Sequence, residues 1–252
     1  MSSLHGDREI KRSGTGVLTI GKEIGYDLSH VDSYGFEYGL KDLKVMLINP
    51  PVSFDCFYGE WDLSDVKSSS PPIGILSLAS MIRKYGYPVR ILDAHAEGMT
   101  ISDIIEIVDE FKPHVVGLTA MTVMISASAE IAKAIKAFNP EITTIIGGVH
   151  VTAEPIETLR RYTQFDLATV GEGEVVFTEI LERIRKNLPR DVIQSLVWRE
   201  GEKINVNPRR AFFKSLDEFP PPAFDLVPEL FNHYRLSVFG TKKFRSVGLV
   251  TS

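Results

Sequence analysis

Residues that could hold a ligand follow directly after several short apolar runs of this sequence. Gly147 and Gly148 come after one such run. Two adjacent glycines expose backbone without Cβ atoms, and a planar group could lie flat against that surface; a tight turn would explain one of them more easily than both. Thr119, Met121 and Thr122 come after another run. They could contact a buried ligand, although hydroxyls at this place can also cap the next helix.

Other loops carry prolines, glycines and an acid in comparable positions. The first apolar run is followed by Asn-Pro-Pro and then by about twenty residues, whereas ordinary strand–helix connections take about two to six. Pro72 suits a helix start and Gly74 would let the backbone approach a ligand; a capped helix behind a surface insertion is the alternative. Glycines flanking an acid at 171–173 could line the same pocket or serve a turn and a helix dipole. The candidate cofactor-binding residues are Asn49, Pro50, Pro51, Pro72, Gly74, Thr119, Met121, Thr122, Gly147, Gly148, His150, Gly171, Glu172 and Gly173.

An acidic residue, Asp93, ends a further apolar run and is followed by His95 and Gly98. An acid at this place holds a ribose in dinucleotide-binding folds, which also need a G-x-G-x-x-G loop after the first strand. Here that place reads Asn-Pro-Pro-Val-Ser-Phe, so a nicotinamide cofactor is excluded. We interpret Asp93 and His95 as loop residues, and we assign no catalytic residue and no metal ligand.

Short apolar runs alternate with segments of helical period from residue 44 onward. In Ile101–Phe111 the apolar residues follow the i, i+3, i+4 spacing of a helix with one buried face. The runs are nearly all apolar, which is typical of strands covered on both faces. We therefore predict an α/β, doubly wound, flavodoxin-like (Rossmann-like) sheet of five parallel strands in the order 2-1-3-4-5. The expected strands are 44–48, 89–92, 115–119, 142–146 and 166–170, and the expected helices are 73–85, 101–111, 126–138, 155–162 and 174–186.

The sequence predicts four parts. Residues 1–43 form a glycine-rich extension to which we assign no chemistry, and residues 44–190 form the sheet domain. Residues 191–218 are expected to be a β-hairpin with a glycine turn and a connector. Residues 219–252 begin with a proline-rich linker, because proline lacks the donor that a helix or central strand needs, and end in the strand-like run Val247–Ser252.

Composition excludes several classes of protein. The chain has 252 residues, of which 44% are hydrophobic and 24% charged, as in a soluble globular protein. A net charge of −5 does not favour nucleic-acid binding. The longest apolar stretch, Val115–Ile125, is too short for a transmembrane segment, and residues 1–30 lack a signal-peptide core; we expect a cytoplasmic protein. The single cysteine, Cys56, excludes a disulfide framework and a Cys-only metal site.

Residues 44–186 resemble the N-terminal cobalamin (B12)-binding domain of B12-dependent radical SAM enzymes. Each matching motif is weak alone, but their order and spacing are specific. The motifs are Asn-Pro-Pro at 49–51, Pro-Pro-Ile-Gly-Ile-Leu-Ser-Leu-Ala at 71–79, Leu-Asp-Ala at 92–94, Gly-Gly-Val-His-Val-Thr at 147–152 and Val-Gly-Glu-Gly-Glu at 170–174.

The resemblance implies bound cobalamin and a chain that is the N-terminal part of a radical SAM enzyme, a methyltransferase or a relative. In that family a TIM-like barrel follows in the same chain, and its first strand corresponds to Val247–Ser252. A C-x-x-x-C-x-x-C loop after that strand holds a [4Fe-4S] cluster that works with S-adenosylmethionine. Those cysteines are not in this sequence, so we expect no catalysis by the chain alone.

The segment from Asp93 to Gly98 also matches the D-x-H-x-x-G motif by which other cobalamin domains supply a histidine to cobalt. In those proteins the motif follows the first strand, whereas here it follows the second. We interpret the match as accidental. The resemblance instead implies cobalamin with its own base detached and no histidine replacing it, so His95→Ala should change little.

A flavodoxin-like signalling or small-ligand-binding domain without catalysis is the alternative. A receiver domain would need an aspartate where Thr119 stands, and a hydrolase would need a G-x-S-x-G elbow or a base near Cys56. For the cobalamin hypothesis we expect the loops at 49–51, 119–122 and 147–150 to converge on one pocket, which Gly148→Leu would fill. We also expect Phe224–Ser252 to pack poorly or to contact another molecule.

Overall fold

The computed structural model describes residues 35–52, 70–211, 217–227 and 234. Residues 1–34, Cys56 and the run Val247–Ser252, on which some of the expectations above depend, lie outside these ranges. The strands are β1 (Val45–Asn49), β2 (Val89–Asp93), β3 (Val115–Thr119), β4 (Thr143–Gly147), β5 (Leu167–Thr169), β6 (Leu196–Glu200) and β7 (Lys203–Val206). The helices are α2 (Ile73–Lys84), α3 (Ala94–Glu97), α4 (Ile101–Phe111), α5 (Ile125–Phe138), α6 (Val149–Ala153), α7 (Pro155–Arg161) and α8 (Gly173–Lys186), with a 3-10 turn η1 (Phe224–Leu226).

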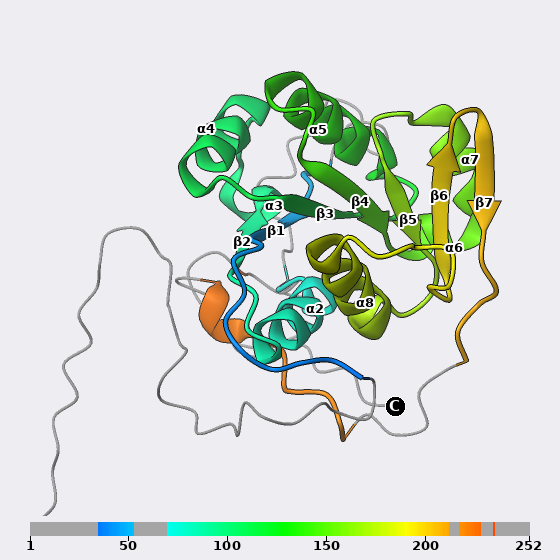
Figure 1. Cartoon of the computed structure of the whole chain (residues 1–252). Coiled ribbons are helices and arrows are strands. Elements are labelled where there is room, and N and C mark those ends of the chain that lie inside the picture. The colour runs from blue at the N-terminus through cyan, green and yellow to red at the C-terminus, as the bar shows by residue number, and fades with distance from the viewer. Residues whose placement is uncertain (1–34, 53–69, 212–216, 228–233, 235–252) are drawn as a thin grey trace, which may run out of the picture.

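One sheet carries the strands in the order β2-β1-β3-β4-β5-β6-β7 (Figure 1). Strands β1 to β5 are parallel, which confirms the predicted fold class and the order 2-1-3-4-5. The sheet has seven strands rather than five, because the hairpin β6–β7 joins it antiparallel at the edge of β5. Leu196 and Val197 pair with Thr169 and Ala168 in this register. The hairpin thus covers a sheet edge that would otherwise be open to other chains.

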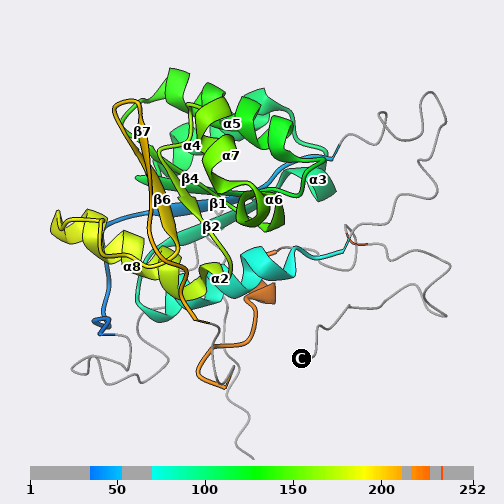
Figure 2. The same ribbon diagram turned by 90° about the vertical axis from the view of Figure 1, so that its right-hand side faces the viewer.

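Helices cover both faces of the sheet (Figure 2). Because successive strand residues point to opposite faces, Leu47 and Val115 pack with α2 and α8, whereas Met46 and Val116 pack with α4, α5 and α7. All four side chains are buried. This arrangement explains why the strands read as continuous apolar runs rather than alternating ones.

The segment 35–43 packs onto the domain as an integral part of it. Phe36 is buried and lies edge-on to Tyr85 with ring centroids 5.1 Å apart, and Leu43 is buried in the same core. The backbone N–H of Lys41 donates to the carbonyl of Gly86 at 3.0 Å. The described end of the extension is therefore attached beside the end of α2 and the start of β2.

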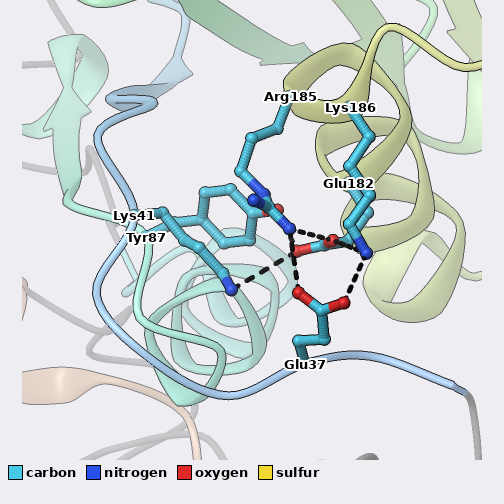
Figure 3. Close-up of polar contacts among 6 residues, drawn as sticks. All are labelled: Glu37, Lys41, Tyr87, Glu182, Arg185 and Lys186. Carbon is cyan, nitrogen blue, oxygen red and sulfur yellow. Dashed lines mark hydrogen bonds and ion pairs between the residues drawn. The ribbon is translucent and has the colours of Figure 1, made fainter.

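A charged cluster fastens this segment to α8. Glu37 forms ion pairs with Arg185 at 3.2 Å and with Lys186 at 2.9 Å. Glu182 accepts hydrogen bonds from the Tyr87 hydroxyl at 2.5 Å and from Arg185 at 2.9 Å. Figure 3 shows the six members of the charged cluster, which are Glu37, Lys41, Tyr87, Glu182, Arg185 and Lys186.

The connector, residues 217–227 and 234, runs back along the outer side of α2. The N–H of Ala223 donates to the carbonyl of Leu76 at 3.1 Å, and the Ser80 hydroxyl donates to the carbonyl of Pro221 at 2.7 Å. Val227 and Tyr234 are buried in the main core. The expectation of poor packing from Phe224 onward is therefore wrong for these residues, because α2 offers the connector both apolar surface and hydrogen-bonding groups.

The described helices include none that is long and apolar enough to cross a membrane. The same part of the chain contains no group of three or more His, Cys, Asp or Glu residues that could hold a metal ion.

Candidate functional site

A cavity of about 230 Å³ opens at the carboxyl ends of the parallel strands, between α2 and α8. The strand order reverses between β1 and β3, and open α/β sheets bind ligands at such a point. Strand residues form its floor, and the first turns of the two helices form its walls. The lining residues are Leu47, Gly74, Ile75, Leu78, Gly117, Leu118, Thr119, Ile145, Gly147, Gly148, Thr169, Gly171, Glu172, Gly173, Glu174 and Phe177.

The structure brings part of the predicted set together in this cavity. Two of the loops expected to converge do so, since the N–H of Ala120 donates to Gly147 at 2.9 Å and that of His150 donates to Ala120 at 3.1 Å. His150 Nδ1 also lies 3.2 Å from the Thr122 hydroxyl. The predicted residues that line the cavity are Gly74, Thr119, Gly147, Gly148, Gly171, Glu172 and Gly173.

The remaining predicted residues are not among the lining residues of the cavity. Met121, Thr122 and His150 lie in the two converging loops, beside the cavity. None of residues 49–51 lines the cavity: Asn49 pairs in register with Asp93, and its side-chain amide donates to that carboxylate at 2.8 Å. The Asn49 side chain thus points toward the neighbouring strand β2 and not into the cavity. Pro72 precedes α2 and lies outside the lining set.

Glycine is needed at positions 147 and 148 for close packing, and not only to leave an open surface. Gly148 has φ +104°, and a Cβ there would lie 2.7 Å from the Ala120 carbonyl oxygen and 2.9 Å from its nitrogen. A Cβ on Gly147 would lie 2.8 Å from Thr169 Oγ1. Gly148→Leu would therefore strain the backbone as well as fill the pocket. The expectation that this substitution would act only by filling the pocket is wrong.

Sequence reasoning missed Gly117 in the middle of β3. A Cβ at this position would lie 2.8 Å from Leu47 Cδ2 and 2.9 Å from Phe177 Cε2. The absence of a side chain here lets Leu47 and Phe177 approach the strand beside the cavity. A signal was available, because glycine inside an apolar strand often marks a close approach of a ligand or another chain segment.

Glu174 is the acidic residue of the first turn of α8 and lines the cavity. Burial raises the pKa of its carboxyl above the usual range, and the neighbouring charge of Glu172 raises it further, while backbone hydrogen bonds at the helix start oppose the shift. Cavity-facing polar groups are otherwise few. The cavity is suited to a largely uncharged group.

Asp93 and His95 have structural partners. Asp93 is 1% exposed and caps α3 by accepting from the N–H of Ala96, while Gly98 ends that helix in the left-handed conformation. His95 Nδ1 accepts from the N–H of Val52 at 3.3 Å. The spacing D-x-H-x-x-G is thus that of a capped single helical turn, and the interpretation of Asp93 as an ordinary loop residue missed its burial.

Most of the residues around this cavity lie in a segment that matches a known family of ligand-binding domains. Residues 62–181 match the model described as the B12 binding domain, and they include most of the cavity lining. These residues are a B12-binding domain. This assignment favours the cobalamin hypothesis over the flavodoxin-like signalling alternative.

Two curated relatives of the B12-binding domain are methyltransferases by name, and others are named as anaerobic magnesium-protoporphyrin IX monomethyl ester cyclases. An uncharacterized methyltransferase of Pyrococcus horikoshii is 34% identical over 193 residues, which cover 75% of this chain and 40% of the relative. The cytidylyl-2-hydroxyethylphosphonate methyltransferase of Streptomyces wedmorensis is 28% identical over 195 residues, covering 69% of this chain and 34% of the relative. The chain thus spans less than half the length of these relatives.

Solved structures show the same fold. The cobalamin-dependent S-adenosylmethionine radical enzyme OxsB, with aqua-cobalamin and S-adenosylmethionine bound, superposes with a TM-score of 0.62 at 22% identity, over 77% of this chain and 26% of that one. The radical S-adenosylmethionine methyltransferase TsrM of Kitasatospora setae, with cobalamin and a [4Fe-4S] cluster bound, gives 0.56 at 16% identity, over 70% and 30%.

The cavity of the B12-binding domain fits part of such a cofactor. Its volume of about 230 Å³ is smaller than the range of about 300–1,000 Å³ typical of whole-ligand pockets. One planar ring could enter it, between the walls formed by Leu78 and Phe177 and beside the exposed backbone of Gly147. A larger macrocycle would have to remain outside, at the strand ends.

Proposed function

We propose that the chain is the cobalamin-binding module of a B12-dependent radical SAM enzyme, a methyltransferase or an enzyme of related radical chemistry. The observation that carries the proposal is the glycine-lined cavity at the switch point of a B12-binding domain. The names of the two methyltransferase relatives support methyl transfer, and the cyclase names support related radical chemistry. The proposal includes a radical SAM barrel following in the same chain, to which S-adenosylmethionine and a [4Fe-4S] cluster would belong.

In this proposal the cavity holds the nucleotide base of cobalamin. Ring atoms would contact Leu78 and Phe177, while the hydroxyls of Thr119 and Thr169 are polar groups within reach of the lining. The base would leave water for an apolar slot, which favours binding roughly in proportion to the apolar area buried. Gly147 and Gly148 line this slot and add no side chain to it.

The macrocycle would lie on the apolar edge formed by Met121, Val123 and Val149. These residues are 50%, 41% and 69% exposed; Met121 and Val123 follow β3, and Val149 follows β4 as the first residue of α6. Exposed large apolar groups beside a pocket often mark a binding surface. When bound, cobalamin would supply a cobalt centre that can carry a methyl group; the residues named here would orient the cofactor and exclude water from the surface that it covers.

Cobalt would take no histidine from His95, whose Nδ1 accepts the Val52 N–H. His150 and Thr122 pair with each other at the edge and would contact the periphery of the cofactor. We therefore extend the proposal to cobalamin with its base detached from cobalt and seated in the cavity.

Titration of the purified chain with hydroxocobalamin, followed by visible absorption and desalting, tests this function. We expect one corrinoid per chain, retained through desalting, and an unchanged spectrum of the bound form in His95→Ala. A folded chain that retains no corrinoid at micromolar concentration would exclude the function for this module. Loss of binding or a shifted spectrum in His95→Ala alone would make that histidine a cobalt ligand.

A further inference from the structure

A buried carboxylate, Asp93, joins three parts of the chain. Its Oδ1 accepts hydrogen bonds from the Asn49 side-chain amide at 2.8 Å and from the Ala96 N–H at 3.1 Å. Its Oδ2 accepts the Tyr234 hydroxyl at 2.8 Å. The end of β1, the start of α3 and the connector therefore meet at one side chain that is 1% exposed.

Tyr234 is held in the form that donates this hydrogen bond. Its side chain is buried, with 6% of the residue exposed. Burial raises the pKa of the hydroxyl, and the neighbouring Asp93 carboxylate raises it further. The phenol thus stays neutral at physiological pH and donates to Asp93 Oδ2.

The connector reaches Asp93 along α2, whose first turn lines the cavity. Arg83 of α2 holds the connector through two hydrogen bonds to Asp225, at 2.5 and 3.0 Å. The pair lies toward the far end of α2 from the cavity-lining Gly74. In Figure 1 the described turn of the connector, in orange, lies beside α2. Tyr234 therefore links the connector to Asp93 at the carboxyl end of β2, and the cavity opens at the carboxyl ends of the neighbouring strands.

The loop after β1 depends on the same group of residues. Asn49 is bound to Asp93, and the Val52 N–H donates to His95 in the helix that Asp93 caps. This loop starts at the end of β1, two residues beyond the cavity-lining Leu47. A change at Asp93 would shift both attachments of the loop.

We infer that the hydrogen bond from Tyr234 to Asp93 is a positioning contact that couples the connector to the cofactor site. A buried carboxylate oxygen that loses its partner is destabilised by its desolvation. Release of Tyr234 would therefore favour a rearrangement of Asp93, and with it of Asn49 and α3. Coupling between two sites is reciprocal, so a ligand that stabilises residues 49–52 would in turn hold the connector. The link to cobalamin rests on the function proposed above.

Hydrogen exchange of the chain without ligand tests the coupling alone. Tyr234→Phe keeps the ring and removes the hydroxyl, and we expect about tenfold faster exchange of the Val52 and Ala96 amides, as for the loss of one hydrogen bond to a charged group. Arg83→Gln is the matched control, because it loosens the connector at Asp225 without touching Asp93. Unchanged exchange at both amides in Tyr234→Phe, or an equal increase in Arg83→Gln, would overturn the inference.

A double variant separates the contact from general destabilisation. Asp93→Asn removes the charge, and we expect Tyr234→Phe to add less to loop exchange in that background than in the wild type. Exchange in α5 and β4 should stay constant in all variants. Purely additive effects, or exchange that rises throughout the sheet, would show that Tyr234 acts only on stability.

Hydroxocobalamin then tests the link to the site. We expect bound corrinoid to slow exchange in residues 217–227 of the wild type, but not of Tyr234→Phe, and we expect about fivefold weaker affinity in the variant. If the wild type binds and the two chains show equal affinity and equal connector protection, the link is wrong while the proposed function stands. If the wild type binds no corrinoid, the proposed function fails, and the exchange experiment without ligand still decides the coupling.

Discussion

The two ends of α8 shift the pKa of a glutamate in opposite directions. At the amino end, Glu174 lines the cavity, and burial raises the pKa of its carboxyl. At the other end, burial would also raise the pKa of Glu182, but hydrogen bonds from Arg185, Tyr87 and Lys186 outweigh it and hold the pKa below its usual range. One end therefore leaves space and few charges, and the other fills its space with matched charges.

The two ends of α8 therefore have different roles: the carboxyl end holds the segment 35–43 in place, and the amino end lines the ligand cavity. The charged cluster secures the segment 35–43 and the carboxyl end of α8, where basic residues also suit the helix dipole. The cavity at the amino end keeps an apolar floor open beside Gly117 and Gly147. Substitutions at the carboxyl end of α8 should affect the free energy of unfolding, whereas those at the amino end should affect ligand binding.

The largest expected effect comes from breaking the charged cluster. Glu182→Ala leaves Tyr87, Arg185 and Lys186 without their shared acceptor, and we expect a loss of about 3 kcal/mol in the free energy of unfolding. Glu174→Ala is the matched control on the same helix and should change stability by less than about 1 kcal/mol. Chemical denaturation followed by circular dichroism measures both. Equal losses in the two variants would remove the distinction between the ends of α8.

A smaller loss of stability should follow Gly117→Ala at the cavity floor. The new methyl group would lie within 3.0 Å of Leu47 and Phe177, and overpacking of this kind costs about 1–3 kcal/mol. Leu47→Ala in the same chain should relieve part of the clash, so the double variant should be more stable than the sum of the single effects implies. Strict additivity in denaturation would contradict the close packing of β3.

Gly74 allows the cavity to be filled without strain. A Cβ there meets nothing within 4 Å, so Gly74→Ala and Gly74→Leu should keep or improve stability, because glycine inside a helix costs about 1 kcal/mol relative to alanine. We expect hydroxocobalamin affinity to fall about tenfold for Gly74→Leu, near 1.4 kcal/mol, and less for Gly74→Ala. Wild-type affinity in both variants would show that the ligand does not enter between α2 and α8.

The sequence predicted the parallel strands and their order because local pattern carries that information. Residues 115–119 (VVGLT) and 142–146 (ITTII) are mostly apolar and carry no charge, as is typical of strands covered on both faces. Loops at the strand ends then indicated where the cavity lies. The Tyr234–Asp93 contact could not be predicted, since 141 residues separate its partners and a lone tyrosine in a linker has no pattern. The burial of Phe36 could not be predicted either, because Gly35 and Gly39 interrupt any apolar pattern around it.

The smallest expected effect is a change in pH dependence, and it has opposite signs at the two ends of α8. The lowered pKa of Glu182 means that its carboxylate adds stability above the unfolded value near 4.5, and that this stability is lost as pH falls through the folded pKa. Glu182→Gln should therefore be less stable than the wild type at pH 7, and the gap should narrow below pH 4.5.

Glu174 should show the reverse. Its raised pKa means that the folded state favours the protonated carboxyl, so stability is present below the unfolded value near 4.5 and decreases as pH rises through the folded pKa. Glu174→Gln removes that decrease, and the variant should gain on the wild type between pH 4.5 and neutrality. Denaturant unfolding of the three chains at several pH values measures both gaps. If the two gaps change in the same direction with pH, the cations of the charged cluster do not distinguish the two glutamates.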